Sequence, residues 1–112
     1  MREAIAAVRH RNADQIAFLE RSLADIVEAA QLTSTDDEHD PEGATIAYER
    51  AQVSALLSQS RIDLVAVDAA AERVDNGTIT TCVRCGSSIA MARLLALPTA
   101  CACIRCAAGD GR

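Results

Sequence analysis

TCVRCGSSIAMARLLALPTACACIRC, residues 81–106, contains two C-x-x-C pairs with seventeen residues between them. Two cysteines separated by two residues can direct both sulfurs onto one ion through a tight backbone knuckle, and Gly86 provides the backbone freedom that such a turn needs. Two knuckles together supply four thiolates. The spacing therefore predicts one tetrahedral zinc site. Its expected ligands are Cys82, Cys85, Cys103 and Cys106.

A zinc ion with four sulfur ligands has no open position for water or substrate, so we expect a structural role for it. Such an ion holds together a segment that lacks the apolar mass to fold alone. Two redox dithiols or two disulfides are the alternative interpretations of the four cysteines. A redox dithiol usually opens a helix in a β-α-β setting, which this sequence lacks.

Cys101 is the fifth cysteine and lies two residues before Cys103. That spacing is too short for both to join one knuckle, so we expect Cys101 to be a small buried apolar residue. A redox-sensitive thiol is the alternative. The N-terminus shows no signal sequence and no apolar run reaches membrane-spanning length, so we expect a cytoplasmic protein with reduced thiols.

The composition favours closely packed helices over a bulky globular core. The 112 residues include one Phe, one Tyr and no Trp, and alanine supplies much of the apolar content. The formal net charge is −5, whereas a DNA-binding zinc module needs a basic surface. We therefore expect no direct sequence-specific binding to DNA.

Two long helices are predicted before the cysteines. The first runs from Arg2 to about Leu32, and the second from about Ala44 to Asp75, where Asn76-Gly77 is typical of a helix C-terminus. Apolar residues recur in the first at alternating spacings of three and four, as Ile16, Leu19, Leu23, Ile26 and Ala30. The second carries a similar seam formed by Ile46, Val53, Leu57, Leu64, Val67, Ala71 and Val74.

Residues 33–43 connect the two helices, with Asp40 as a helix N-cap and Pro41 as the first helical position. Two apolar seams joined by a short loop predict an antiparallel coiled-coil hairpin about 40 Å long. A register centred on the loop places Phe18 near Leu57, Val8 near Val67 and Ile5 near Ala71.

The predicted fold class is mainly α, with the hairpin in residues 1–77 and a small four-cysteine zinc finger in residues 78–112. Residues 78–81 are expected to be extended, and residues 89–97 to form one or two helical turns that end at Pro98. Three apolar side chains of those turns are expected to cover the zinc, namely Ile89, Leu94 and Leu97.

The acidic charge of the chain is concentrated in the connecting loop. Five of the sixteen acidic residues lie there, and the remaining eleven match the eleven basic residues. These five are Asp36, Asp37, Glu38, Asp40 and Glu42. A solvated loop with helix caps explains the pattern simply, since carboxylates near a helix N-terminus are favoured by its dipole. The alternative is a lever that carries negative charge into a basic or metal-bearing cavity of a partner.

A third interpretation is a catalytic or ion-binding site built from Asp37, His39, Asp40 and Glu42. Carboxylate oxygens suit Mg²⁺, and a histidine can act as a base. A loop at the end of a hairpin has no enclosing pocket in which to hold and dehydrate a substrate. We therefore expect no enzymatic activity.

The finger pattern resembles that of the DksA/TraR proteins, bacterial regulators with a four-cysteine zinc finger. The shared residues follow the order C-x-x-C-G (82–86), Ile89, ARL (92–94), ALPTA (96–100) and C-I-x-C (103–106). Residues 37–43 look like the loop of small actinobacterial-type members. The resemblance covers essentially the whole chain.

This resemblance implies an accessory transcription regulator that binds RNA polymerase through its secondary channel. In the family an acidic hairpin tip approaches the polymerase active centre, while the finger braces the outside of the channel. The implied tip residues here are Asp36, Asp37, Glu38, Asp40, Glu42 and Ala44. Residues 42–44 read Glu-Gly-Ala where better-studied members carry Asp-x-Ala, and the chain ends soon after Cys106 without a C-terminal helix.

Together with the cysteine spacing and the lack of a long apolar run, this resemblance leads us to expect one structural Zn²⁺, no membrane association and a monomer. The alternative function is a coiled-coil zinc-finger adaptor, or a self-associating interaction module, with no polymerase role.

Overall fold

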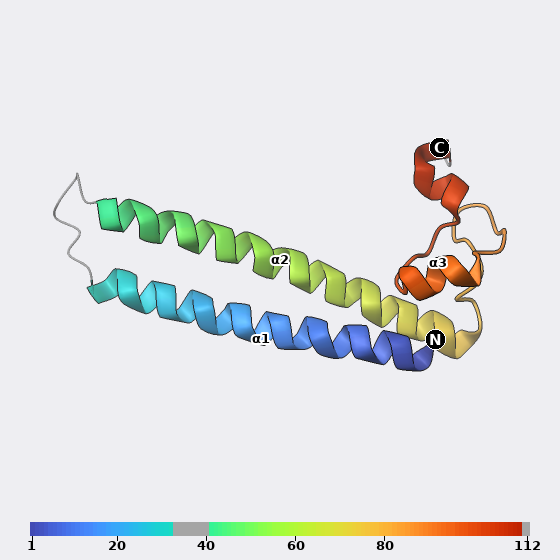
Figure 1. Cartoon of the computed structure of the whole chain (residues 1–112), viewed down its shortest axis with the longest axis horizontal. Coiled ribbons are helices and arrows are strands. Elements are labelled where there is room, and N and C mark those ends of the chain that lie inside the picture. The colour runs from blue at the N-terminus through green and yellow to red at the C-terminus, as the bar shows by residue number, and fades with distance from the viewer. Residues whose placement is uncertain (33–40, 111–112) are drawn as a thin grey trace. The chain divides into compact units, whose positions relative to one another are not determined.

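The computed structural model describes residues 1–32 and 41–110. It contains α1 (Arg2–Leu32), α2 (Pro41–Asn76), α3 (Met91–Ala96) and a π-helical turn η1 (Cys106–Asp110). Figure 1 shows α1 and α2 as long helices that run in opposite directions, with α3 and η1 after them. The mainly helical fold, the long hairpin and the short helix between the cysteine pairs are confirmed. No helix in these described ranges combines the length and apolar character needed to cross a membrane.

The ends of α2 follow the backbone preferences of Pro and Gly. The helix begins at Pro41, which confirms Pro41 as the first helical position, although the tip loop was given as extending to residue 43. At its other end Gly77 has a φ of 78°, a left-handed conformation that suits glycine. The amide of Thr78 donates to the carbonyl of Arg73 at 2.9 Å, as in a Schellman motif. This termination confirms the stop predicted from Asn76-Gly77.

The chain divides into two compact units. Unit 1 joins Met1–Arg11 to Leu64–Arg112, and unit 2 is Asn12–Asp63.

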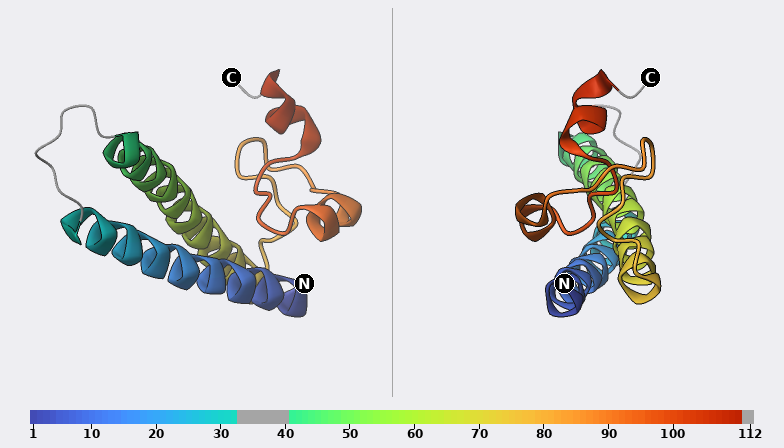
Figure 2. Two further views of the ribbon diagram at one scale, coloured as in Figure 1. Left: turned by 60° about the vertical axis from the view of Figure 1, so that its left-hand side comes forward. Right: turned by 90° about the vertical axis from the view of Figure 1, so that its right-hand side faces the viewer.

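The buried apolar cluster of unit 1 draws on both helices and the finger, and Figure 2 shows the start of α1 beside the last turns of α2. Leu94 and Ala70 are completely buried, and Val67 is 2% exposed. The other buried members are Ile5, Ile79, Cys82, Ile89, Cys103 and Cys106. Cysteines are therefore part of the core itself. The sequence placed Ile5 near Ala71 and Val8 near Val67. Ile5 and Val67 are buried in this cluster and Val8 and Ala71 pack against it, which is consistent with both pairs.

Two ion pairs join α1 to α2 in unit 1. Arg2 contacts Asp75 at 3.0 Å, and Arg9 contacts Asp68 at 2.7 Å. All four side chains are at least half exposed, so each pair contributes little to stability. Their positions nevertheless show that the first turns of α1 lie beside the last turns of α2, as expected of an antiparallel hairpin.

Unit 2 has a thinner core than unit 1. Leu19 and Leu57 are its buried apolar residues within the described part of the chain, beside buried Asn12 and Ser60. Phe18, which the sequence placed near Leu57, is 60% exposed, so that prediction is wrong. Leu19, which was predicted to lie on the apolar seam, is buried as expected. Phe18 points away from it because neighbouring helix positions lie about 100° apart.

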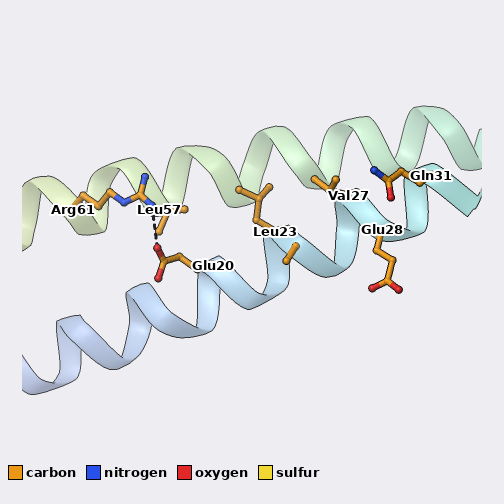
Figure 3. Close-up of a pocket in the computed structure, with 8 residues that line it drawn as sticks. Glu20, Leu23, Val27, Glu28, Gln31, Leu57 and Arg61 are labelled. Atoms are coloured by element: carbon orange, nitrogen blue, oxygen red, sulfur yellow. Dashed lines mark hydrogen bonds and ion pairs between the residues drawn. The ribbon is translucent and has the colours of Figure 1, made fainter.

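An open groove lies between the two helices of unit 2, with a volume of about 480 Å³. Figure 3 shows Leu23 and Val27 of α1 on the side of α2, with the Glu20–Arg61 ion pair near Leu57. That pair has an N–O distance of 3.2 Å. Ala24 is a small residue that supplies little volume to the lining, so the seam remains only partly filled here.

The core of unit 1 can be tested by shortening one leucine at a time. We expect Leu94→Ala to lower the free energy of unfolding by about 2–5 kcal/mol, because it leaves a cavity at a fully buried position. Leu95→Ala is the matched control, since Leu95 is its neighbour in α3 and is 62% exposed. Denaturant unfolding of the zinc-loaded protein measures both, and equal losses would contradict the assigned core.

Candidate metal centre

Backbone hydrogen bonds shape the first cysteine knuckle. The amide of Cys82 donates to the carbonyl of Ser87 at 2.8 Å, and the amide of Gly86 donates to the carbonyl of Cys82 at 3.0 Å. Gly86 has a φ of 77°, which explains a glycine directly after the pair. Thr81 and Ser88 form an isolated antiparallel bridge that closes the loop. These contacts turn Cys82 and Cys85 toward the same point.

The second knuckle begins a turn of helix. The amide of Ala107 donates to the carbonyl of Cys103 at 2.9 Å, and η1 begins at Cys106. The amide of Val83 donates to the carbonyl of Cys101 at 2.9 Å and thereby connects the first knuckle to the segment that leads into the second. The two pairs meet although seventeen residues separate them.

The four sulfurs of Cys82, Cys85, Cys103 and Cys106 lie within 4.8 Å of one another. The distance between the sulfurs of Cys85 and Cys103 is 3.7 Å. A tetrahedral zinc ion with Zn–S bonds of about 2.3 Å holds its sulfurs about 3.8 Å apart. The cluster therefore fits one zinc ion, as predicted from the spacing. Bound zinc would cross-link the two knuckles.

The thiols differ in their readiness to ionise. Backbone hydrogen bonds at Cys103 and Cys85 lower the pKa of the Cys82 thiol to about 6. Hydrogen bonds from Ser87 lower the pKa of Cys85, the exposed member of the four. The pKa of Cys106 is raised to about 12 by its contact with the Cys103 thiol and by burial. The protein thus favours thiolate at the first knuckle before metal arrives.

Two arginines hydrogen-bond to the backbone of the segment that precedes Cys103. Arg73 Nη2 at the end of α2 donates to the carbonyl of Ala100 at 3.1 Å, and Arg93 Nε of α3 donates to the carbonyl of Ala102 at 3.1 Å. Sequence analysis missed both residues, because arginine bonds to backbone carbonyls leave no pattern of spacing. They hold the segment that positions the second knuckle.

Two expectations about the finger are wrong. Cys101 is exposed: its backbone carbonyl accepts a hydrogen bond from the amide of Val83, and its side chain lies at the surface. Leu97 is 52% exposed, because α3 ends at Ala96 and Leu97 has left its buried face. Ile89 and Leu94 are buried with the ligands, as expected.

Most of the acidic tip lies outside the described residues, namely Asp36, Asp37, Glu38, His39 and Asp40. Glu42 lies in the first turn of α2, and Ala44 is exposed on the same helix. Their role stays a prediction.

Comparison with known proteins identifies the fold. No family model and no curated protein sequence matches the chain. Among solved structures, the transcription factor DksA2 from Pseudomonas aeruginosa superposes with a TM-score of 0.80 at 24% sequence identity. The match covers 97% of this chain and 78% of that one. This chain therefore has the DksA fold, and its four-cysteine cluster is consistent with a DksA/TraR-type zinc finger.

Serine substitutions distinguish the four cysteines expected to bind zinc from Cys101. We expect Cys82→Ser to reduce bound zinc from about one ion per chain to near none after dialysis against a chelator, and to loosen the finger. Cys101→Ser is the control and is expected to keep its zinc, because Cys101 lies outside the cluster. Metal analysis by mass spectrometry measures both. Zinc loss in the Cys101 variant would contradict the ligand set.

Proton release on metal binding tests the pKa pattern. Because the pKa of Cys82 is about 6, this thiol is already ionised at pH 7.5, and zinc binding should release fewer than four protons. As the pH falls through 6, Cys82 also becomes protonated, so release should rise and affinity should fall more steeply. Calorimetry in buffers with different ionisation enthalpies counts the protons. Release of four protons at pH 7.5 would contradict the lowered pKa.

Proposed function

We propose that this protein is an accessory transcription regulator that binds RNA polymerase. One observation carries the proposal: over 97% of its length the chain shares the fold of a DksA-type transcription factor, at a TM-score of 0.80. The four-cysteine cluster at the same end of the sequence as the family's finger adds support. The resemblance of the finger motif to DksA/TraR proteins, noted from sequence, points independently in this direction.

The charge of the chain supports a protein partner over DNA. A net charge of −5 opposes binding to the phosphate backbone, and five carboxylates are gathered in residues 33–43. Negative charge presented by a hairpin suits a basic cavity, and attraction of this kind guides orientation and speeds encounter. The secondary channel of the polymerase is the cavity that the family resemblance suggests. We propose that the tip enters it and alters initiation.

The parts of the chain then take different roles. The hairpin, residues 1–77, supplies the contact through Asp36, Asp37, Glu38, Asp40, Glu42 and Ala44. The finger, residues 78–112, holds one structural zinc ion and supports the hairpin. We infer that the protein performs no catalysis of its own. We place its action in the cytoplasm, where thiols stay reduced and free to bind metal.

A second candidate is an interaction module that self-associates or joins other proteins without a polymerase. The exposed apolar residues Tyr48, Ile62 and Val65 of α2 favour some helix-mediated contact. Binding to purified polymerase core enzyme distinguishes the two candidates. A zinc-loaded protein that does not bind core enzyme at micromolar concentrations would leave the second candidate.

Neutralising the tip tests the proposed contact. We expect Asp40→Asn with Glu42→Gln to keep helicity and zinc content but to weaken the effect on transcription by about tenfold, the change that corresponds to 1.4 kcal/mol of lost contact. The control pair, Glu3→Gln with Glu49→Gln, removes the same charge from exposed helix positions and should act like the native protein. Abortive initiation assays with purified polymerase measure the effect. Normal regulation by the tip variant would contradict the acidic-tip proposal.

A further inference from the structure

Three successive backbone carbonyls directly precede Cys103, and each accepts a hydrogen bond from a different part of unit 1. We call these three residues the carbonyl segment: Ala100, Cys101 and Ala102. Their donors come from the end of α2, from the first knuckle and from α3, and are, in that order, Arg73 Nη2, the amide of Val83 and Arg93 Nε. Three attachments on three residues leave the backbone before Cys103 little freedom to move.

Packing holds the carbonyl segment only weakly. Ala100 and Ala102 are partly buried against the apolar cluster of unit 1, and the amide of Ala100 donates to the carbonyl of Leu97 at 2.9 Å. An alanine side chain buries little apolar area, so it gains little free energy from this contact. The arginine bonds therefore supply a restraint on position that the alanine side chains do not.

Arg73 and Arg93 differ from the two arginines that lie inside the cysteine pairs. Both are half-buried, whereas Arg84 and Arg105 are exposed. Arg73 Nε is buried and has no hydrogen-bond partner in the described structure. Burial of part of a guanidinium with an unpaired N–H costs free energy. The bond from Arg73 to Ala100 therefore adds little net stability, and its main effect is on the position of the carbonyl segment.

We propose that Arg73 and Arg93 are positioning residues for the metal centre, which act through the carbonyl segment to hold Cys103 where its sulfur completes a tetrahedral site. Cys103 directly follows the segment, and its sulfur lies 3.7 Å from that of Cys85. A metal site needs its ligands held to within about 0.5 Å, and groups behind the ligands usually provide this restraint. Here those groups bind the backbone that carries the ligand.

The two arginines donate from different nitrogens of the guanidinium. Arg93 uses Nε, which lies as many bonds from Cα as the amide nitrogen of a glutamine side chain. Arg73 uses Nη2, which lies two bonds further out. A glutamine can therefore donate from the place of Nε but does not reach the place of Nη2. This difference in reach lets each bond be tested separately.

Zinc affinity, measured by competition with a chelator, tests the proposal. We expect Arg73→Met and Arg93→Met each to weaken zinc binding at least about tenfold, because methionine keeps an apolar stem and removes the donor. Arg105→Met is the matched control, since it removes the same charge from an exposed position between two of the ligands. It should bind zinc nearly as tightly as the native chain. Equal losses in all three variants would show that the arginines act through their charge, and would overturn the proposal.

Glutamine variants separate the hydrogen bond from the charge. Arg93→Gln should restore most of the zinc affinity that Arg93→Met loses, because its amide can still donate to the carbonyl of Ala102. Arg73→Gln should bind zinc as weakly as Arg73→Met, because its amide stops short of the carbonyl of Ala100. If Arg93→Gln and Arg93→Met lose the same affinity, the bond to Ala102 does not position the ligand and the proposal is overturned.

Cobalt in place of zinc separates positioning from general stabilisation. The visible spectrum of Co²⁺ bound by thiolates depends on its coordination geometry. We expect the spectra of Arg73→Met and Arg93→Met to depart from the native one, because Cys103 is displaced. Leu57→Ala leaves a cavity in the core of unit 2, so it lowers stability away from the finger and should keep the native spectrum. Native spectra in both arginine variants would show that these residues only stabilise the fold, and would overturn the proposal.

The inference rests on the metal centre and is independent of polymerase binding. A native chain that takes up neither zinc nor cobalt would overturn the metal centre and this inference together. A native chain that binds zinc with an affinity that both arginine variants match would overturn this inference alone.

Discussion

Convergence of four thiols is the constraint on which the finger depends. Between Gly77 and Gly109 the chain has the six-residue α3, one isolated bridge and the start of η1. Of its large apolar side chains, Ile79, Ile89 and Leu94 are the buried ones, too few to hold a fold by burial alone. Cys82, Cys103 and Cys106 are nevertheless core residues, buried with Leu94 and Val67. The metal centre and the apolar core of unit 1 are thus one structure, so anything that disturbs the ligands also disturbs the ends of both long helices.

The finger is basic, whereas the connecting loop is acidic. The finger from residue 77 to residue 109 carries three arginines and no acidic residue, while residues 33–43 carry five carboxylates and no base. Four thiolates around Zn²⁺ leave a net charge of −2, which the finger's arginines offset. The finger therefore has a formal charge of about +1 once metal is bound, and the connecting loop carries the largest share of the negative charge of the protein. This separation of charge is consistent with a partner whose basic surface attracts the acidic loop.

Patterns governed by local chemistry could be predicted from the sequence. The cysteine spacing predicted the cluster, helix periodicity predicted α1 and α2, and Gly77 and Gly86 take the left-handed conformations expected of them. Features that depend on tertiary packing were predicted less well. Leu19 lies on the seam as predicted, but the sequence wrongly paired Phe18 with Leu57 and wrongly predicted that Cys101 is buried. Arg73 and Arg93 act on backbone carbonyls, which every residue offers, so no motif marks them.

Asn12 is a buried polar residue in the core of unit 2. Its side-chain oxygen is buried and has no hydrogen-bond partner in the described structure, and Ser60 is a second buried polar residue of unit 2. A buried polar group of this kind costs free energy but makes slipped pairings of a hairpin costlier still. With two buried leucines against the nine buried members of the unit 1 cluster, unit 2 should exchange its amide hydrogens sooner. Unit 2 would then open locally while unit 1 stays folded. Such opening would let the helices of unit 2 adjust to a partner without release of the metal.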